Sequence, residues 1–513
     1  MGRQGCGGNQ SRSPRRPRRA APVPSWIIRR VSARIARMVS RDSERGFRRE
    51  IRLFDATMIV MGVMIGSGIF IVSADIARTV GSPGWLLAVW LFSGLVTLLA
   101  AACYGELSAM MPQAGGQYVY LREIYGPMMG FLYGWTLFMV VQTGSIAAVG
   151  VAFAKFAAVL VPAASEQNIV LEIGRLKVSA AQVVAIASIA LLTWVNTLGL
   201  REGKLVQDAF TITKAAALLL LVACGLLLAR DASTLTANFR DFWSATRVVG
   251  GPDGGVAREA LSGVGLLMAL GAASVGSLFA CDAWNNVTFT AGETVDPRRT
   301  VTRALVLGVA IVVGLYMLAN LAYILALPVA GDPGAASALG RGMQFAADDR
   351  VGTAAAATIL GPVAAIVMAV LVMVSTFGCN NGMILTGARV YWAMARDGLF
   401  FRRTGALNRH AVPGVALVFQ GVWACALCLT GKYGDLLDYV IFSVLIFYAL
   451  SVAGIFILRR RRPGAERPYR APGYPVLPAL YVLIAVAICV DLLIVKPRYT
   501  WPGLIIVALG VPV

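Results

Sequence analysis

The chain has 513 residues, of which 58% are hydrophobic and only 14% are charged, and its mean hydropathy is +0.72. Several apolar runs exceed the roughly 20 residues that a helix needs to cross a bilayer, which excludes a soluble globular protein. The net charge of +20 does not indicate a nucleic-acid-binding protein, because most basic residues fall on one side of the predicted spans.

Two segments precede the first apolar run. Residues 1–24 are rich in Arg, Pro and Gly, and we expect a disordered basic leader there. In residues 25–44, apolar side chains recur at helical spacing among arginines, which predicts a basic amphipathic helix on the inner membrane surface. A solvated segment, or a leader included by a wrong start assignment, explains the same residues. The apolar positions are Trp26, Ile27, Ile28, Val31, Ile35, Met38 and Val39.

Residues 45–513 are predicted to form an all-α membrane domain of twelve spans. The last apolar run is short, so we expect the chain to end inside helix 12. Fifteen of the 46 basic residues precede the first span, which places the N-terminus in the cytoplasm. The predicted spans are 53–74, 85–109, 127–160, 178–200, 204–229, 262–293, 301–327, 356–395, 413–430, 435–459, 475–495 and 500–513.

The first span contains an interruption, Gly66-Ser67-Gly68, where a membrane helix would be deepest. Glycine costs about 1 kcal/mol in a helix interior, and unwound backbone at this depth must be buried in protein or line a cavity. Close contact between helices through small residues is the alternative explanation. A second interruption, at residues 279–284, lies in the other half of the chain. Paired broken helices indicate the binding site of a transporter.

The first interruption offers groups that match both ends of an amino acid. A half-helix that starts after Gly66 points its first N–H groups and its positive dipole end at an anion, which suits a carboxylate. Carbonyl groups at both breaks lose their intrahelical partners and suit an ammonium. The N–H groups belong to Ser67, Gly68 and Ile69, and the carbonyl groups lie near Ile65, Phe279 and Ala280.

Lys214 lies near the middle of the fifth span. A lone charge inside a membrane is expensive and marks a functional site by default. A structural brace on the unwound carbonyl groups is the alternative role, and the two roles are compatible.

Four ordered stretches carry a resemblance to a known family. They are MIGSGIF (64–70), CYGELSAMMPQAGGQYVYLREIYGP (103–127), LFACDAWNNVTFTAGETVDPRR (278–299) and STFGCNNGMILTGARVYWAMARDG (375–398). Together they resemble the L-type amino acid transporter family of the amino acid–polyamine–organocation superfamily, with the bacterial branch closest, over residues 45–513. The resemblance implies two five-helix inverted repeats, broken helices 1 and 6, helices 11 and 12 outside the repeats, and alternating access.

The resemblance also assigns roles to single residues. Phe279 resembles the aromatic gate over the substrate, and Cys281 belongs to the same substrate-binding segment. Asn285 matches a position near the substrate, although a helix cap would also explain it. Lys214 matches the place where sodium-coupled relatives hold a cation, which implies sodium-independent transport. Asp282 stands where animal members tend to carry glycine; it would hold a substrate amine, carry a proton or cap the second half-helix.

We therefore expect a sodium-independent amino acid transporter, an exchanger or a proton-coupled symporter, in a bacterial inner membrane. A cationic amino acid or polyamine transporter that uses Asp282 is the first alternative, and an amino acid sensor that moves nothing is the second. The sequence has no HExxH, Walker A or catalytic-triad pattern, so we expect no enzyme, cofactor or metal site.

Two expectations concern partners and loops. Animal relatives join a heavy subunit through a cysteine between helices 3 and 4, but Val161–Lys177 has no cysteine. We therefore expect no disulfide-linked subunit, and only the amino acid substrate and the bilayer as partners. Tyr104, Glu106 and Glu123 are expected at the inner rim, where they would tie loops to helices.

Overall fold

The computed structural model describes residues 47, 49–173, 176–229, 231–250, 256–430, 433–495 and 497–511. The predicted disordered leader (1–24) and amphipathic helix (25–44) lie outside the described residues. The described chain falls in one compact unit that begins at Phe47.

Helices long and apolar enough to cross a membrane dominate this unit. The described residues contain nine such helices, or ten if the bent pair α2 (Leu53–Met64) and α3 (Gly68–Val80) is one span. This confirms an all-helical, multi-pass membrane protein. The other long helices are α4 (Pro83–Met110), α6 (Pro127–Thr136) continued by η1 (Leu137–Val141) and α7 (Gln142–Leu160), α8 (Ala180–Thr197), α9 (Leu200–Leu228), α11 (Gly263–Ala280), α13 (Pro297–Ala326), α16 (Pro362–Arg396), α18 (Tyr433–Arg461) and α19 (Val476–Val495).

Shorter elements connect these helices or close the bundle. Three of them, α15, α17 and α20, each cover part of a predicted span, and α12 and η3 lie within the predicted span 262–293. The short elements are α5 (Gln117–Tyr125), η2 (Pro162–Ala164), α10 (Ala232–Arg240), α12 (Asn286–Phe289), η3 (Ala291–Glu293), α14 (Ala338–Arg341), η4 (Ala347–Asp349), α15 (Val351–Leu360), η5 (Arg402–Gly405), α17 (Gly414–Cys428) and α20 (Pro497–Leu509).

Proline and glycine set several of these boundaries. Pro83, Pro297 and Pro362 are the first residues of α4, α13 and α16, where the missing N–H costs nothing. Gly81 ends α3 in the left-handed conformation, with φ 60°. Gly361, with φ 86°, separates α15 from α16, so the span predicted at 356–395 is two helices and the long one begins at Pro362.

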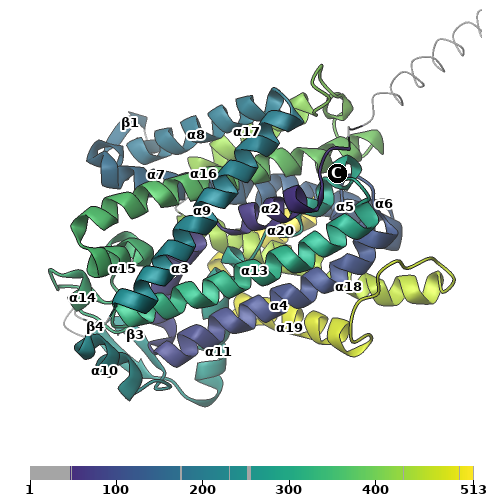
Figure 1. The fold of residues 1–513 in the computed structure, drawn as a ribbon. Coiled ribbons are helices and arrows are strands. Elements are labelled where there is room, and N and C mark those ends of the chain that lie inside the picture. The colour runs from purple at the N-terminus through teal and green to yellow at the C-terminus, as the bar shows by residue number, and fades with distance from the viewer. Residues whose placement is uncertain are drawn as a thin grey trace, which may run out of the picture. The chain divides into compact units, whose positions relative to one another are not determined.

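The broken pair α2 and α3 lies inside the bundle (Figure 1). Helix α13 packs against α2 and α4, α16 packs against α7 and α9, and α11 packs along α3. The residues at the break are enclosed by these neighbours: Ile65 is fully buried, and Ser67 is 1% exposed. Unwound backbone here therefore faces protein, as membrane depth requires.

Two antiparallel hairpins lie toward the left of Figure 1, at one end of the helices. Strands β1 (Ile169–Ile173) and β2 (Leu176–Ser179) pair Glu172 with Lys177, and β3 (Thr246–Gly250) and β4 (Val256–Ala260) pair Arg247 with Glu259. The segment Val161–Lys177 thus contains η2 and most of the first hairpin. Its described residues are structured rather than an open loop.

Candidate functional site

The first predicted break is present. Helix α2 ends at Met64, α3 begins at Gly68, and the axes of the two helices differ by 40°. The bent backbone leaves the last carbonyl groups of α2 without their usual partners four residues on. Each carbonyl from Gly62 to Gly66 accepts a side-chain hydrogen bond from another helix, as the next two paragraphs describe.

Lys214 of α9 is the charged donor among the side chains that replace the lost intrahelical N–H groups. Its buried Nζ atom donates hydrogen bonds to the carbonyl oxygens of Gly62 and Ile65, the latter at 2.9 Å, and to that of Ser375 at 3.4 Å. The Ser375 hydroxyl also donates to the Ile65 carbonyl at 3.0 Å and to the Gly66 carbonyl at 3.3 Å. The ammonium is therefore surrounded by carbonyl oxygens, which is the environment of a bound cation.

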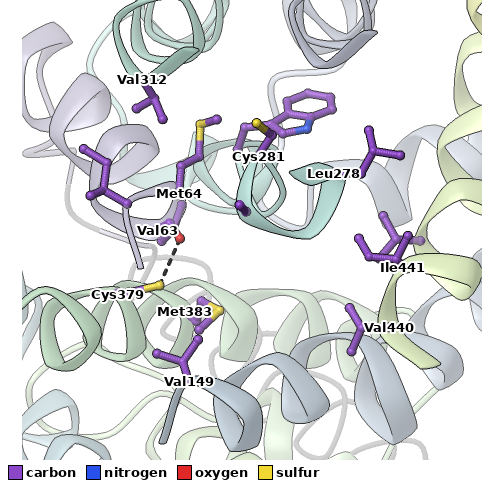
Figure 2. Packing of buried hydrophobic residues seen from close by; sticks show 14 of the residues in the cluster. Val63, Met64, Val149, Leu278, Cys281, Val312, Cys379, Met383, Val440 and Ile441 are labelled. Carbon is purple, nitrogen blue, oxygen red and sulfur yellow. Dashed lines mark hydrogen bonds between the residues drawn. The ribbon is translucent and has the colours of Figure 1, made fainter. Parts of the chain in front are cut away.

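Neutral side chains bind the remaining carbonyls. The Cys379 sulfur of α16 lies 3.0 Å from the Val63 carbonyl oxygen, as the dashed line in Figure 2 shows. The Tyr316 hydroxyl of α13 lies 2.7 Å from the Met64 carbonyl oxygen and 3.2 Å from that of Ala280. Because Ala280 ends α11, this one hydroxyl connects both broken helices.

The second predicted break follows directly. Helix α11 ends at Ala280, and the chain resumes a helical course only at Asn286, where the short α12 begins. Between them Ala283 has φ 63°, a conformation that a residue with a Cβ adopts only at a cost. The predicted span 262–293 is thus broken rather than continuous.

The two breaks touch at Gly68 and Ala280. A Cβ on Gly68 would lie 2.6 Å from the Cβ of Ala280, and one on Gly66 would lie 3.1 Å from the Cys379 sulfur. Close helix contact, the alternative explanation of the glycines, is therefore real. It coexists with the breaks rather than replacing them, since Gly68 also lines a cavity between the two broken helices.

That cavity is small, with a volume of about 20 Å³, room for about one water molecule. Figure 2 shows its surroundings, with Met383 and Val149 facing the segment at Val63 and Met64. Six of the predicted substrate-binding residues line it, whereas Ile65, Ile69 and Cys281 are buried and do not line it. The six are Gly66, Ser67, Gly68, Phe279, Ala280 and Asp282.

A second cavity of the same size adjoins the first and is more polar. Asp282, Ala283, Ser145 and Met383 line both cavities, so they form the wall between them. The predicted residue Asn285 lines only the second one.

Asp282 does not cap the second half-helix. One of its carboxylate oxygens accepts a hydrogen bond of 2.7 Å from the Tyr448 hydroxyl of α18. Asn285 stands at the N-cap position of α12, but its side chain makes no capping bond; its amide donates to the Gln117 side chain at 2.8 Å instead. Two of the three roles considered for Asp282 therefore remain: it would hold a substrate amine, or it would carry a proton.

Sequence reasoning missed several residues of the second cavity. Gln142 and Ser145 lie on α7, directly after the π-helical segment η1, an irregularity that is frequent at functional sites. Because they are polar residues within the apolar span 127–160, their part in a polar cavity could have been predicted from the sequence. Tyr133 and Tyr448 carried none, because a single tyrosine in an apolar run is ordinary packing.

Ion pairs join two of the residues predicted at the inner rim to neighbouring segments. Glu106, which is 1% exposed, pairs with Arg459 at 2.6 Å and accepts from the backbone N–H of Ala471 at 2.7 Å. Glu123 pairs with Arg462 at 3.5 Å. These two glutamates tie loops to helices as predicted, whereas Tyr104 packs edge-on against Trp284 at 4.9 Å in the interior.

Comparison with known proteins agrees with this architecture. A family model described as amino acid permease matches residues 51–511. The chain belongs to the amino acid permease family. It is 30% identical to the human Asc-type amino acid transporter 1, over 92% of this chain and 83% of that protein. It is 29% identical to the mouse large neutral amino acids transporter small subunit 2, over 91% and 80%. It is 27% identical to the human b(0,+)-type amino acid transporter 1, over 88% and 84%.

These relatives are transporters and not enzymes, and they belong to one family with this chain. The chain is accordingly a multi-pass amino acid permease. The recognition of an L-type amino acid transporter relative is confirmed at the level of the family.

Proposed function

We propose that this permease binds an amino acid zwitterion between its two broken helices and moves it by alternating access. The observation that carries the proposal is that both breaks line one buried cavity and touch there, at Gly68 and Ala280. On this proposal, residues 45–513 form twelve helices. Ten of them make up two five-helix inverted repeats, and the first helix of each repeat is broken. We place this domain in a bacterial inner membrane, with the N-terminal end of the chain on the cytoplasmic side.

The carboxylate of the substrate is assigned to the start of α3. Ser67, Gly68 and Ile69 supply N–H groups at the positive end of that helix. Two of the three line the cavity, and Gly68 brings α3 against α11 without a side chain in between. A carboxylate there would take the place of the single water that the cavity admits.

The ammonium is assigned to the second break. The Ile65 carbonyl already accepts from both Lys214 and Ser375, whereas Tyr316 is the one side chain among the described residues that donates to the Ala280 carbonyl. A carbonyl oxygen has two lone pairs, so Ala280 retains capacity for an ammonium. Asp282, on the same cavity wall, would add the opposite charge.

Sodium independence is the second part of the proposal. Lys214 places a fixed ammonium among the carbonyls of Gly62, Ile65 and Ser375. Such a cluster of carbonyl oxygens would suit a metal cation, and a lysine that occupies it removes the need for one.

The decisive experiment is uptake into proteoliposomes that contain the purified chain. Vesicles preloaded with a panel of amino acids test exchange, and an imposed pH gradient tests proton symport. We expect uptake of at least one amino acid without sodium. Binding of amino acids with no transport under any of these conditions would contradict the proposal and favour a sensor.

A cationic amino acid or a polyamine is a second candidate substrate class, because Asp282 has a neutral partner. Its side chain accepts a hydrogen bond from the Tyr448 hydroxyl, and none of the ion pairs among the described residues includes it. A buried carboxylate without a cation favours a cationic guest. Competition between neutral and cationic amino acids in the same vesicles, with Asp282→Asn beside the wild type, distinguishes the two classes.

A further inference from the structure

An apolar groove lies between α4, α11 and α19, away from the two helix breaks. Its volume is about 520 Å³, and its walls are mainly aliphatic and aromatic. Leu267 is 68% exposed and Phe92 is 38% exposed, so the groove opens on the surface of three membrane-spanning helices. It shares no lining residue with either cavity of the candidate site.

One charged side chain lines this groove. Asp491 of α19 has a buried Oδ2 atom that accepts no hydrogen bond from any residue that the structure describes. This atom packs against α11, where a Cβ on Gly271 would lie 2.3 Å from it. A carboxylate within a membrane span is costly unless a donor or a cation accompanies it.

The Asp491 carboxylate lies at the same end of the groove as Trp85 and Trp243. Trp85 is in the first turn of α4 and Asp491 is near the end of α19, and these antiparallel positions belong to the same end of the bundle. The indole of Trp85 donates to the Trp243 carbonyl at 2.9 Å, and Trp243 is 59% exposed. Tryptophan gathers where the apolar core of the bilayer meets the head groups. From there the groove runs toward Phe92, deeper along α4.

We propose that the groove binds a phospholipid with a primary ammonium head group, phosphatidylethanolamine. One acyl chain lies along α4, α11 and α19, and the ammonium pairs with the Asp491 carboxylate. A primary ammonium offers both the opposite charge and N–H donors. The quaternary ammonium of phosphatidylcholine has no N–H group, and phosphatidylglycerol brings only negative charge. The site depends on the membrane setting of the chain and not on the substrate that it carries.

The lipid head group is the variable of the test. The purified chain is placed in nanodiscs that differ only in N-methylation of the ethanolamine, and the lipids retained on it are counted by native mass spectrometry. Wild type should retain phosphatidylethanolamine and its monomethyl derivative about tenfold better than phosphatidylcholine, the size expected of one hydrogen bond to a charged group. Equal retention of all three lipids would overturn the proposal without any variant.

Two variants and a matched control locate the site. Asp491→Asn keeps the shape of the side chain and should abolish the head-group preference, and Gly271→Leu should fill the groove and reduce total retention. Asp241→Asn removes an exposed aspartate of the loop after α10 and should leave the preference unchanged. A preference that persists in Asp491→Asn would place the lipid elsewhere. Stabilisation by amino acids, measured in parallel, shows that each variant is folded and tests the substrate site separately.

Discussion

Gly68 is the residue at which the two broken helices meet, and a larger side chain there tests the candidate site directly. In Gly68→Leu the new Cβ would stand 2.6 Å from the Cβ of Ala280, so α3 and α11 must separate. Overpacking of this kind costs about 1–3 kcal/mol, which a large bundle tolerates. We expect a folded protein that amino acids no longer stabilise in a thermal-shift titration.

Gly314→Leu is the matched control for this substitution. Gly314 also lies on a long helix, α13, but a Cβ there would meet no atom within 4 Å. The control should respond to amino acids as the wild type does. If Gly68→Leu responds equally, the substrate lies elsewhere.

Lys214 gives a second prediction at a single residue. Lys214→Ala leaves the Gly62 carbonyl without its side-chain donor, at a cost of roughly 1–3 kcal/mol for a buried group. Transport should be lost. The wild type should transport equally well in sodium, potassium or choline, because the ammonium already occupies the place of a cation.

Thr213→Ala is the control for Lys214. Thr213 is the preceding residue and is exposed, and its hydroxyl binds only the Ala209 carbonyl of the same helix. Uptake by this variant should be normal. Normal uptake by Lys214→Ala, or a wild type that requires sodium, would refute the role given to the lysine.

The residues that bind the first break differ in how easily the sequence alone identifies them. A lone lysine in an apolar span is conspicuous because burying its charge is expensive, so Lys214 was predictable. Ser375, Cys379 and Tyr316 also bind the neighbouring carbonyls, but each is an ordinary residue for its helix. Their role depends on which helices pack against the break, and a single chain does not specify that.

At the level of elements, the ion pair between Glu293 and Arg389 joins the end of the second broken segment to α16. The two side chains are 1% and 0% exposed, and a nitrogen and an oxygen lie 2.9 Å apart. Glu293→Gln would leave the guanidinium buried without its counter-charge, which costs about 3–5 kcal/mol. We expect a clear fall in the unfolding temperature of the purified protein.

The exposed pair between Arg247 and Glu259 is the control for this element-level prediction. Its side chains are 49% and 55% exposed across the β3–β4 hairpin. Glu259→Gln should cost less than about 1 kcal/mol, because water solvates both charges. Equal effects of the two substitutions would show that the buried pair does not brace the broken helix.

The sequence predicted the positions of the long helices more accurately than the places where helices are interrupted. The long apolar runs predicted α4, α13 and α19 within a few residues, because the bilayer demands such runs. Both breaks were predicted, as glycine and polar residues interrupt the apolar pattern there. Gly361, which separates α15 from α16, was missed because α15 is itself apolar. The π-helical segment at Leu137–Val141 has no compositional signature at all.

At the scale of the whole molecule, the cavities were beyond sequence reasoning. The wall shared by Asp282, Ser145 and Met383 joins the second break to α7 and α16, which are distant from it in the chain. Periodicity identifies which residues a helix buries, but the partner helix decides whether they pack tightly or leave a cavity. The two breaks were therefore predictable from the sequence. The polarity of Gln142 was visible there too, but its place beside the second break was not.

The last prediction concerns the chain as an independent transporter. The segment 161–177 has no cysteine, and its described residues form η2 and most of a hairpin. All seven cysteines of the described residues are free, and most are buried within the helices. The purified chain alone should therefore transport amino acids in proteoliposomes, and a thiol reductant should leave the rate unchanged. Uptake that appears only after a second subunit is added, or that a reductant abolishes, would contradict this prediction. Either outcome would direct attention to residues outside the described part of the chain.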